Sequence, residues 1–512
     1  MLFNSYPFLF LFLPLALLGF HAAARVGPQT AKIWLCAVSL VFYACWHLEW
    51  LILLLCSIVF NYGMSSQLRG EDLPDTRRQS LLLTAAITIN LLLLVYYKYL
   101  FSLLGFFHEQ GWLAADAGSV ALPIGISFFT FTQIGYLVDC RQGLVRERGF
   151  LEYLLFVSFF PHLTAGPILH HREVMPQFAD PATYRLHAGN MAVGFTLFSV
   201  GLCKKVLLAD SIVTWVDYGN AHLPRIDFVT AWSVAVAYSM QLYFDFSGYS
   251  DMAIGLGILF AVRMPLNFNS PFKALSIIEF WQRWHITLTR YVTLLVYNPL
   301  SLYVARRRQR AGLAVNRNAL ASASGFAGMI AFPTMITTLV AGIWHAAGLQ
   351  FVAYGALHGV YLCVNHVWRL YRKPLQTSSL GRTAKTWSVF WRWLLTYLAV
   401  LAAMVLFSAH SLEDAGLLLK GMLGLNGPGF PVSPNVRSHW FYVGILMGIA
   451  FGLPNIYQFL GTWSPALTAV RALQWPALTW RPALRYAMVF GLLLGAAALS
   501  SERTVRFLYF QF

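Results

Sequence analysis

The sequence is poor in charge, in paired cysteines and in the short motifs of soluble enzymes. Only 11% of its 512 residues are charged, whereas a soluble domain carries about a quarter, so an ordinary water-soluble protein is excluded. The six cysteines form no C-x-x-C pair, so neither a disulfide framework nor a metal site is expected. The absence of a P-loop, a dinucleotide fingerprint, G-x-S-x-G and H-E-x-x-H disfavours nucleotide-dependent and hydrolytic soluble chemistry.

Long apolar runs are present instead. Hydrophobic residues make up 58% of the chain, and one helical span needs about 20 of them. We predict spans at 3–20, 32–64 (two short passes), 80–106, 119–138, 150–166, 190–207, 229–262, 326–368 (two passes with a break), 386–407, 440–460 and 484–500. The expected fold class is an all-α polytopic membrane protein of roughly 11 to 14 transmembrane and re-entrant helices.

Basic residues give the chain a net charge of +16. They gather in loops near 69–78 (Arg69, Arg77, Arg78), 141–148, 306–310 and 369–373 (Arg369, Arg372, Lys373), and are sparse in 108–118 and 408–439. This bias is typical of the positive-inside rule and not of nucleic-acid binding, so we expect no nucleic-acid partner. We therefore place the basic loops in the cytoplasm and segments 108–118 and 408–439 on the opposite side of the membrane. The cluster ARRRQR (305–310) could also contact lipid phosphates or an anionic cofactor.

One hydrophobic stretch contains no charged residue at all. Between Arg317 and Arg369 the groups that titrate near neutrality are three histidines, His345, His358 and His366. A histidine in hydrocarbon needs a partner or a task. We predict a hairpin with a turn at about 346–350, which would place His345 deep in the bilayer, either as interhelical packing or as a functional group. Close backbone approach or a broken helix would be allowed by Gly342, Gly348, Gly355 and Gly359.

The stretch IIEFWQRWHITLTRY (277–291) combines tryptophans with polar groups. Ser276 and Glu279 have the spacing of a capping box, so a helix should begin there. Glu279 and Arg283 are four residues apart and can pair. The periodicity predicts one amphipathic helix over 276–290 with His285 at the edge between its two faces. Such a helix either lines a wet cavity or lies in the membrane interface.

Two carboxylates lie within the apolar stretch QLYFDFSGYSDMAIG (241–255). Asp245 and Asp251 could form a proton or cation relay, as in a transporter. Alternatively they are structural, pairing with an arginine such as Arg263 or Arg283, or capping broken helix ends. The pattern leaves both interpretations open.

Taken together, these stretches resemble the membrane-bound O-acyltransferases, in the bacterial branch that contains alginate O-acetyltransferase and the membrane protein of D-alanine transfer to teichoic acid. The matching stretches follow the family's order over residues 122–348, and short weak matches at FNYGM (60–64) and YYKYLF (96–101) bring most of the N-terminal half under the resemblance. It is carried by LPIGISFFTFTQIGYLVD (122–139), FVSFFPHLTAGPILHHREVMPQF (156–178), GLCKKVLLAD (201–210), YFDFSGYSDMAIGLG (243–257), FWQRWHITLTR (280–290) and GIWHAAG (342–348).

The resemblance implies a fold, a reaction and partners. The fold would be a single membrane domain of helices around a central tunnel, with N-terminal helices in 1–118, a catalytic core in 119–370 and C-terminal helices in 371–512. An acetyl group would pass from acetyl-CoA in the cytoplasm to an exported polysaccharide, directly or through a periplasmic SGNH-type acetyltransferase. No tightly bound cofactor is implied. The family's catalytic histidine falls on His345 and a second functional histidine on His285.

Chemistry supports these assignments. Acyl transfer to a hydroxyl needs a base with a pKa near 7, which histidine provides. The developing oxyanion needs a donor, for which His285, Asn318 or a backbone N–H are candidates. Phosphates of the donor would favour Arg306, Arg307, Arg308 or Lys205. The predicted substrate- or donor-binding residues are Trp284, Arg283, Asp245, Asp251, Trp344 and Asn318.

The sequence also departs from the family pattern. After Arg290 the family commonly continues with an acidic residue and two glycines, which are missing from YVTLLVYNPLSLYVARRRQR (291–310). The cytoplasmic donor side could therefore differ. Three alternatives stay open: a proton-coupled secondary transporter, a catalytically silent scaffold subunit, and transfer of D-alanyl or another acyl group.

Overall fold

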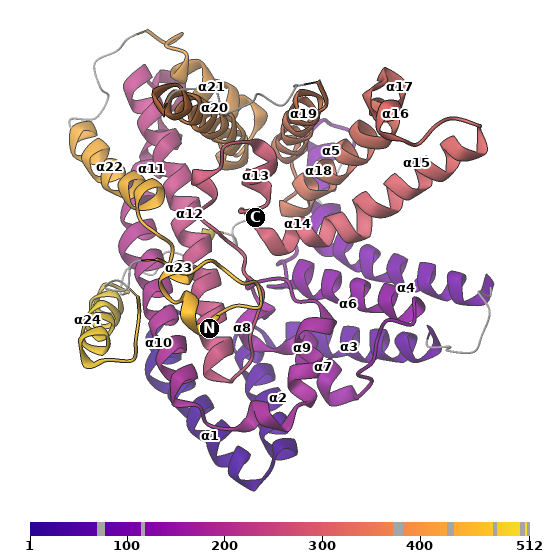
Figure 1. The fold of residues 1–512 in the computed structure, drawn as a ribbon, viewed down its shortest axis with the longest axis vertical. Helices are drawn as coiled ribbons and strands as arrows, with labels where there is room; N and C mark the ends of the chain where they lie inside the picture. The colour runs from indigo at the N-terminus through magenta and orange to yellow at the C-terminus, as the bar shows by residue number, and fades with distance from the viewer. Residues whose placement is uncertain are drawn as a thin grey trace. The chain divides into compact units, whose positions relative to one another are not determined.

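The structure, a computed structural model, describes residues 1–68, 77–113, 118–371, 382–427, 435–474, 479–501 and 507–508 (Figure 1). Within these ranges the regular elements are all helical, which confirms the predicted all-α class. Arg69, Arg372 and Lys373, which helped to assign the cytoplasmic loops, lie outside the described residues.

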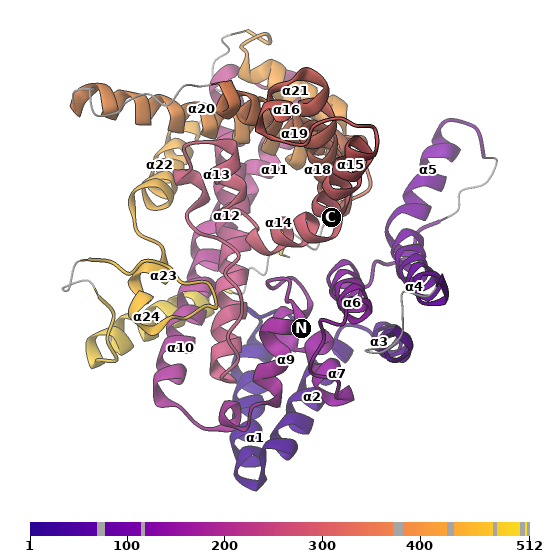
Figure 2. The same ribbon diagram turned by 45° about the vertical axis from the view of Figure 1, so that its right-hand side comes forward.

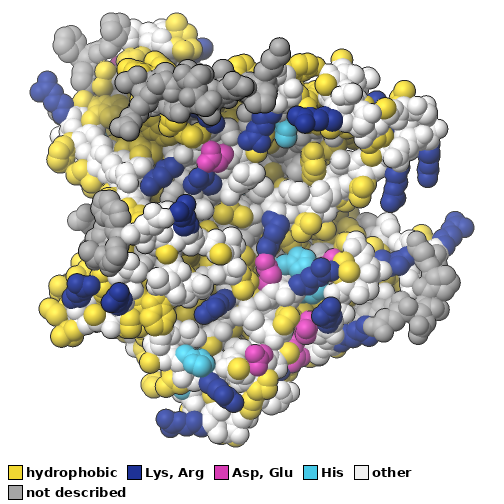
Figure 3. Space-filling view, viewed as in Figure 1, with side chains coloured by type: hydrophobic (Ala, Val, Ile, Leu, Met, Phe, Trp, Pro, Cys, Tyr) yellow, Lys and Arg dark blue, Asp and Glu magenta, His cyan; other side chains and the backbone are white. Residues whose placement is uncertain are grey.

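Six helical segments of the described chain are long and apolar enough to cross a membrane. They are Pro7–Val26, Leu48–Leu68, Arg77–Glu109, Ala188–Ala221, Ala323–His345 and Thr386–Ser408. Each overlaps a predicted span. Large apolar side chains on them are exposed, for example Leu18 and Leu395 at 70% and 72%, and hydrophobic side chains cover much of the face shown in Figure 3. Such surface belongs in lipid, so the chain is a multi-pass membrane protein.

The chain divides into two compact units, each built from separate stretches of sequence. Unit 1 consists of the described residues of 1–207, 245–266 and 455–508, and unit 2 of those of 208–244 and 267–454. The long helix α12 (Phe228–Leu259) contributes its first part to unit 2 and its second part to unit 1. The predicted boundaries at 118 and 370, which separate N-terminal helices, a catalytic core and C-terminal helices, concern function and stay a prediction.

Unit 1 holds the N-terminal helices. They are α1 (Leu13–Val26), α2 (Pro28–Ala44), α3 (Leu48–Leu68), α4 (Arg77–Val95), α5 (Phe101–Glu109), α6 (Ile126–Arg141), α7 (Phe150–Ser158), α8 (Phe160–Leu163), α9 (His171–Ala179) and α10 (Ala188–Cys203), joined later by α23 (Ile456–Phe459) and α24 (Leu484–Ser500). Buried amides link its apolar helices. Asn61 on α3 and Asn90 on α4 donate to each other at 3.1 and 2.7 Å, because polar side chains inside a membrane protein need partners.

Unit 2 holds the remaining helices. They are α11 (Val213–Ala221), α13 (Ile277–Trp281), α14 (Ile286–Val292), α15 (Asn298–Arg310), α16 (Arg317–Ala321), α17 (Ala323–Phe326), α18 (Phe332–His345), α19 (Leu349–Tyr371), α20 (Arg382–Ser408), α21 (Leu412–Met422) and α22 (Val436–Gly452). Within this unit, α18 and α19 lie side by side in both ribbon views (Figure 1; Figure 2).

The hairpin of α18 and α19 agrees with the sequence prediction. α18 ends at His345 and α19 begins at Leu349. The helices approach closely through glycines, since a Cβ added at Gly342 would lie 2.3 Å from the carbonyl oxygen of Phe351, and one at Gly355 2.5 Å from that of Thr338. Small residues at such positions let backbones meet in the membrane.

The predicted single helix over 276–290 is wrong. α13 ends at Trp281 and α14 begins only at Ile286, with His285 between them in the left-handed region (φ +41°). The break arises because backbone groups bond to an upstream segment: Asn269 N–H donates to the Arg283 carbonyl at 2.9 Å and Ile286 N–H to the Asn267 carbonyl at 3.0 Å.

The expected polar contacts around α13 are mostly present. The Ser276 hydroxyl accepts from the Glu279 N–H at 3.2 Å, so Ser276 is the N-cap. The Glu279 carboxylate instead accepts from the Leu275 N–H at 2.9 Å, so the reciprocal half of the capping box is shifted by one residue. The predicted pair between Glu279 and Arg283 is confirmed at 2.8 Å.

Candidate active site

The structure brings the two predicted catalytic histidines together inside unit 2. The ring centroids of His285 and His345 lie 6.4 Å apart, and the residues are 1% and 6% exposed. Aromatic rings surround them: Trp344 lies 5.1 Å from His345 and 6.0 Å from His285, while Phe407 and Tyr354 pack edge-on against His345 at 5.0 and 6.3 Å. The pair is thus held in an enclosed, largely apolar setting.

Asn267 orients His285. Its Oδ1 lies 3.0 Å from His285 Nδ1, 2.9 Å from the Thr287 hydroxyl and 3.4 Å from the Thr287 N–H. Because a backbone N–H can only donate, this side-chain atom is assigned as the amide oxygen. His285 Nδ1 therefore carries the proton in the neutral ring, and Nε2 carries the lone pair.

Sequence reasoning missed Asn267. The residue is fully buried and holds the helix break with its backbone carbonyl as well as its side chain. The one signal was an amide within the mostly apolar segment AVRMPLNFN (261–269), which gave no indication of its distant partner.

His345 occupies the last position of α18. The C-terminal end of a helix carries partial negative charge and stabilises a nearby cation. A proton accepted by the buried His345 would therefore be favoured electrostatically by its own helix. The backbone is extended at Ala346 (φ −159°), between the end of α18 and the start of α19. The N–H groups of this helix break therefore directly follow His345 in the sequence.

His358 has a packing role. It is 1% exposed, and its Nδ1 accepts from the Trp281 indole N–H at 3.2 Å. Its ring lies edge-on to Tyr354 at 4.7 Å, and Tyr354 also contacts His345. His358 thereby links α13 to the helix hairpin that carries His345.

The other predicted residues of unit 2 lie in different surroundings. Trp284 is buried, stacked on Phe280 at 5.6 Å, so its ring is part of the packing. Arg283 is 30% exposed and pairs with Glu279. Asn318 lies exposed on α16. Trp344 therefore lies beside the histidine pair, whereas Trp284 packs on Phe280 and Arg283 pairs with Glu279. Asn318 lies at the surface.

Asp245 and Asp251 belong to unit 1, and each has a lysine partner. Lys205 Nζ lies 2.6 Å from Asp245, and Lys204 Nζ lies 2.6 Å from Asp251. Asp251 also accepts from the Tyr457 hydroxyl at 2.8 Å. Both carboxylates are 2% exposed. The predicted arginine partner is wrong, since two lysines of the π-helical turn Lys204–Ala209, which directly follows α10, supply the charge.

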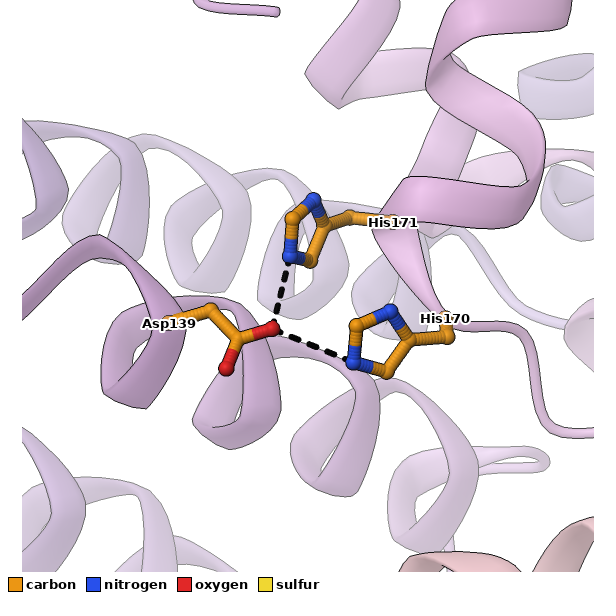
Figure 4. A group of neighbouring side chains, drawn as sticks. All are labelled: Asp139, His170 and His171. Carbon is orange, nitrogen blue, oxygen red and sulfur yellow. Dashed lines mark hydrogen bonds and ion pairs between the residues drawn. The ribbon is translucent and has the colours of Figure 1, made fainter. Parts of the chain in front are cut away.

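A second polar cluster of unit 1 lies outside the predicted site (Figure 4). Asp139 at the end of α6 accepts from His170 and His171 at the start of α9, with Nε2 to Oδ2 distances of 3.1 and 2.8 Å. Burial alone raises the pKa of the Asp139 carboxyl, but the hydrogen bonds and charge of the two histidines outweigh it and hold that pKa well below its usual range. Burial lowers the pKa of His171 despite its bond to Asp139.

Comparison with known proteins agrees with these features. The sequence model of MBOAT, the membrane-bound O-acyltransferase family, matches residues 42–315, which include His285. A peptidoglycan O-acetyltransferase of Helicobacter pylori is 38% identical over 83% of this chain and 80% of its own length. A probable alginate O-acetylase of Azotobacter vinelandii is 34% identical over 82% and 78%. A teichoic acid D-alanyltransferase of Bacillus subtilis is 27% identical over 47% and 58%. The chain belongs to the membrane-bound O-acyltransferase family and is an acyltransferase of the membrane.

Proposed function

We propose that this protein transfers an acetyl group from cytoplasmic acetyl-CoA to hydroxyl groups of an exported polysaccharide, across a bacterial inner membrane. The observation that carries the proposal is the buried pair of His285 and His345, within 6.4 Å of each other and enclosed by aromatic rings. The names of two relatives, acetylating enzymes of peptidoglycan and alginate, favour acetyl as the acyl group and a glycan as the acceptor.

His345 is the base of the proposed reaction. It takes the proton of the acceptor hydroxyl as the hydroxyl oxygen attacks the thioester carbonyl. The tetrahedral intermediate collapses with cleavage of the carbon–sulfur bond, and the proton passes from His345 to the departing sulfur. The products are an O-acetyl ester and free CoA. The end of α18 stabilises the charge that His345 carries between these two transfers.

His285 supports the reaction through the orientation that Asn267 gives it. With Nδ1–H donated to Asn267, the neutral ring presents a hydrogen-bond acceptor at Nε2. It therefore positions a hydroxyl or thiol proton and does not itself stabilise an oxyanion while neutral. That task falls to an N–H donor such as the Trp344 indole or a backbone group at the helix break after His345.

The phosphates of acetyl-CoA are assigned to the basic end of α15. Arg306, Arg307 and Arg310 are exposed there, and guanidinium groups bind phosphate well. Lys205, another candidate from the sequence, is buried in its pair with Asp245 and therefore does not present its charge to the phosphates. On the other side of the membrane, a periplasmic SGNH-type acetyltransferase is proposed as the partner that receives or uses the acetyl group.

The test uses membranes that contain the protein, its polymer and its partner, given acetyl-CoA labelled in the acetyl group. Free CoA and labelled polymer are followed together in wild type, His345→Ala and the control His222→Ala, whose ring is exposed and bonded to a local carbonyl. Loss of both signals in His345→Ala alone is expected. Acetylation that persists in His345→Ala at equal abundance would contradict the role of His345.

The same assay separates the competing functions. A secondary transporter would move substrate without releasing CoA, and a scaffold subunit would leave polymer acetylation independent of both histidines. If wild type releases no CoA but labels polymer from a D-alanyl donor, the acetyl-CoA assignment is wrong while the acyltransferase chemistry stands.

A further inference from the structure

The cluster of Asp139, His170 and His171 has no part in the proposed reaction. The sequence predicts no metal site, but the structure leads to a different view: we propose that these three side chains bind a divalent transition-metal ion through Asp139 Oδ2 and the Nε2 atoms of both histidines. The ligand atoms come from two helices of unit 1, and all of them lie within 4.8 Å of one another. Figure 4 shows the two rings directed at the same carboxylate oxygen.

The distances are close to those of a metal site. A tetrahedral Zn²⁺ ion lies about 2.0–2.2 Å from nitrogen and oxygen ligands, which places neighbouring ligands roughly 3.3 Å apart. The observed separations from Oδ2 are 3.1 Å to His170 and 2.8 Å to His171. Two of the three ligand separations are therefore already close to those of a metal site, and the third, between the two Nε2 atoms, lies within 4.8 Å.

The donor set has the chemistry of a first-row divalent ion. Two imidazoles and one carboxylate suit Zn²⁺, Fe²⁺, Co²⁺ and similar ions, and leave coordination positions open for water. Each neutral ring would move its proton from Nε2 to Nδ1 on binding. His171 Nδ1 is buried and has no hydrogen-bond partner among the described residues. His170 Nδ1 would become a donor on binding, so the bond of 3.4 Å that it accepts from the Arg172 N–H at the start of α9 would be lost.

The surroundings combine rigidity with access. His171 is 1% exposed, and Tyr136 and Phe156 pack edge-on against its ring at 5.5 and 6.4 Å. The side chains of His170 and Asp139 are 19% and 15% exposed, so an ion can enter from that side. The positive charge of the neighbouring Arg172 repels a cation. The negative charge of the Asp139 carboxylate offsets this repulsion, so we expect Asp139 to be an essential ligand.

The experiment measures metal content and not activity. Full-length protein carrying a tag without histidine is purified in detergent, stripped with EDTA, dialysed against Zn²⁺ and analysed for zinc per chain. The variant Asp139→Asn keeps an oxygen that both Nε2–H groups can bond, so its metal-free thermal midpoint should match wild type. His170→Gln tests a second ligand, and His222→Gln removes an exposed histidine elsewhere.

We expect wild type and His222→Gln to bind one Zn²⁺ per chain. Asp139→Asn and His170→Gln should each weaken binding at least about 10-fold, because direct ligands matter more than their outer partners. Co²⁺ substituted for Zn²⁺ should give visible absorption in wild type that is absent from Asp139→Asn. Equal zinc in wild type and Asp139→Asn, or zinc lost equally in His222→Gln, would overturn the proposal. Neither outcome depends on acetyl transfer.

Discussion

Asn267 acts on the segment that carries His285 in two ways. Its backbone carbonyl receives the Ile286 N–H, which keeps the helix broken, and its side-chain oxygen receives the Nδ1–H of His285, which fixes the tautomer. Because catalytic groups work only in a narrow range of orientations, a residue that never touches substrate can still control the rate. Asn267 is therefore a positioning residue.

Replacing Asn267 with Leu should lower the rate of CoA release by about 10–100-fold, the scale of a misplaced catalytic group. The histidine pair would remain, but His285 would no longer be held in the Nδ1–H form. The fall should appear in kcat more than in KM, measured with labelled acetyl-CoA. Asn318→Leu is the matched control, because Asn318 is exposed on α16. Similar losses in both variants would argue against an orienting role.

The buried ion pairs make a prediction about stability. Lys205→Met would leave Asp245 charged and buried without its partner, which costs about 3–5 kcal/mol in comparable pairs. The double variant Lys205→Met with Asp245→Leu should recover much of that loss, since no unpaired charge remains. The free energy of unfolding in SDS titrations would measure both. A double variant as unstable as the single one would indicate that Asp245 has a role beyond the pair.

Individual functional residues were predictable to different degrees. His345 and His285 could be identified because histidines are rare in apolar runs and because the motifs around them resemble a known family. Asn267 and the lysine partners of Asp245 and Asp251 could not, since their importance depends on neighbours 18 to 47 positions away in the sequence. A sequence pattern shows which residue types occur close together along the chain, but it does not show which distant residues come into contact in the fold.

Helix prediction failed where hydrogen bonding and periodicity disagree. Residues 276–290 have the amphipathic spacing of one helix, but bonds from Asn267 and Asn269 remove two backbone groups from the helical ladder. The hairpin of α18 and α19 was predictable because its glycines and its uncharged length both indicate two closely packed spans. Periodicity thus located the helices well and their breaks poorly.

Close packing of α18 on α19 gives a test with a clear control. Gly355→Ala would place a Cβ about 2.5 Å from the Thr338 carbonyl oxygen, and such overpacking costs about 1–3 kcal/mol. We expect a lower thermal midpoint in detergent and reduced activity, because α18 carries His345. Gly444→Ala in α22 has open space around the new methyl group and should be neutral or slightly stabilising. Equal effects at both positions would show that helix packing is not responsible.

The chain as a whole is assembled from segments far apart in sequence. In unit 1 the Phe507 ring stacks on Tyr249 of α12 at 4.5 Å, and the Leu508 N–H donates to Asp245 at 2.9 Å. Neither contact was expected from the sequence, where 507–508 follows the last predicted span without any motif. Hydropathy indicates how many spans a chain has, but not which of them share a unit.

Phe507→Ala should destabilise the protein by about 3–5 kcal/mol, as expected for a large buried aromatic side chain, because Phe507 is 1% exposed. Phe441→Ala removes the same side chain from a position that is 75% exposed on α22, and it should have little effect in detergent. Thermal midpoints of the two variants would be compared with wild type. A Phe507→Ala variant that melts with wild type would show that this contact adds nothing to unit 1.

The late arrival of Phe507 and Leu508 has a consequence for biosynthesis. At about 5–20 residues per second, the ribosome produces these residues roughly 15–60 s after Lys205, so the nascent chain must wait that long for unit 1 to close. During this interval Asp245 lacks its bond to Leu508, and the ring of Tyr249, which already stacks on Phe3, lacks its second contact with Phe507. A chain that ends before residue 507 would never form these two contacts. We expect it to be degraded faster than the full-length chain by the proteases that remove incomplete membrane proteins.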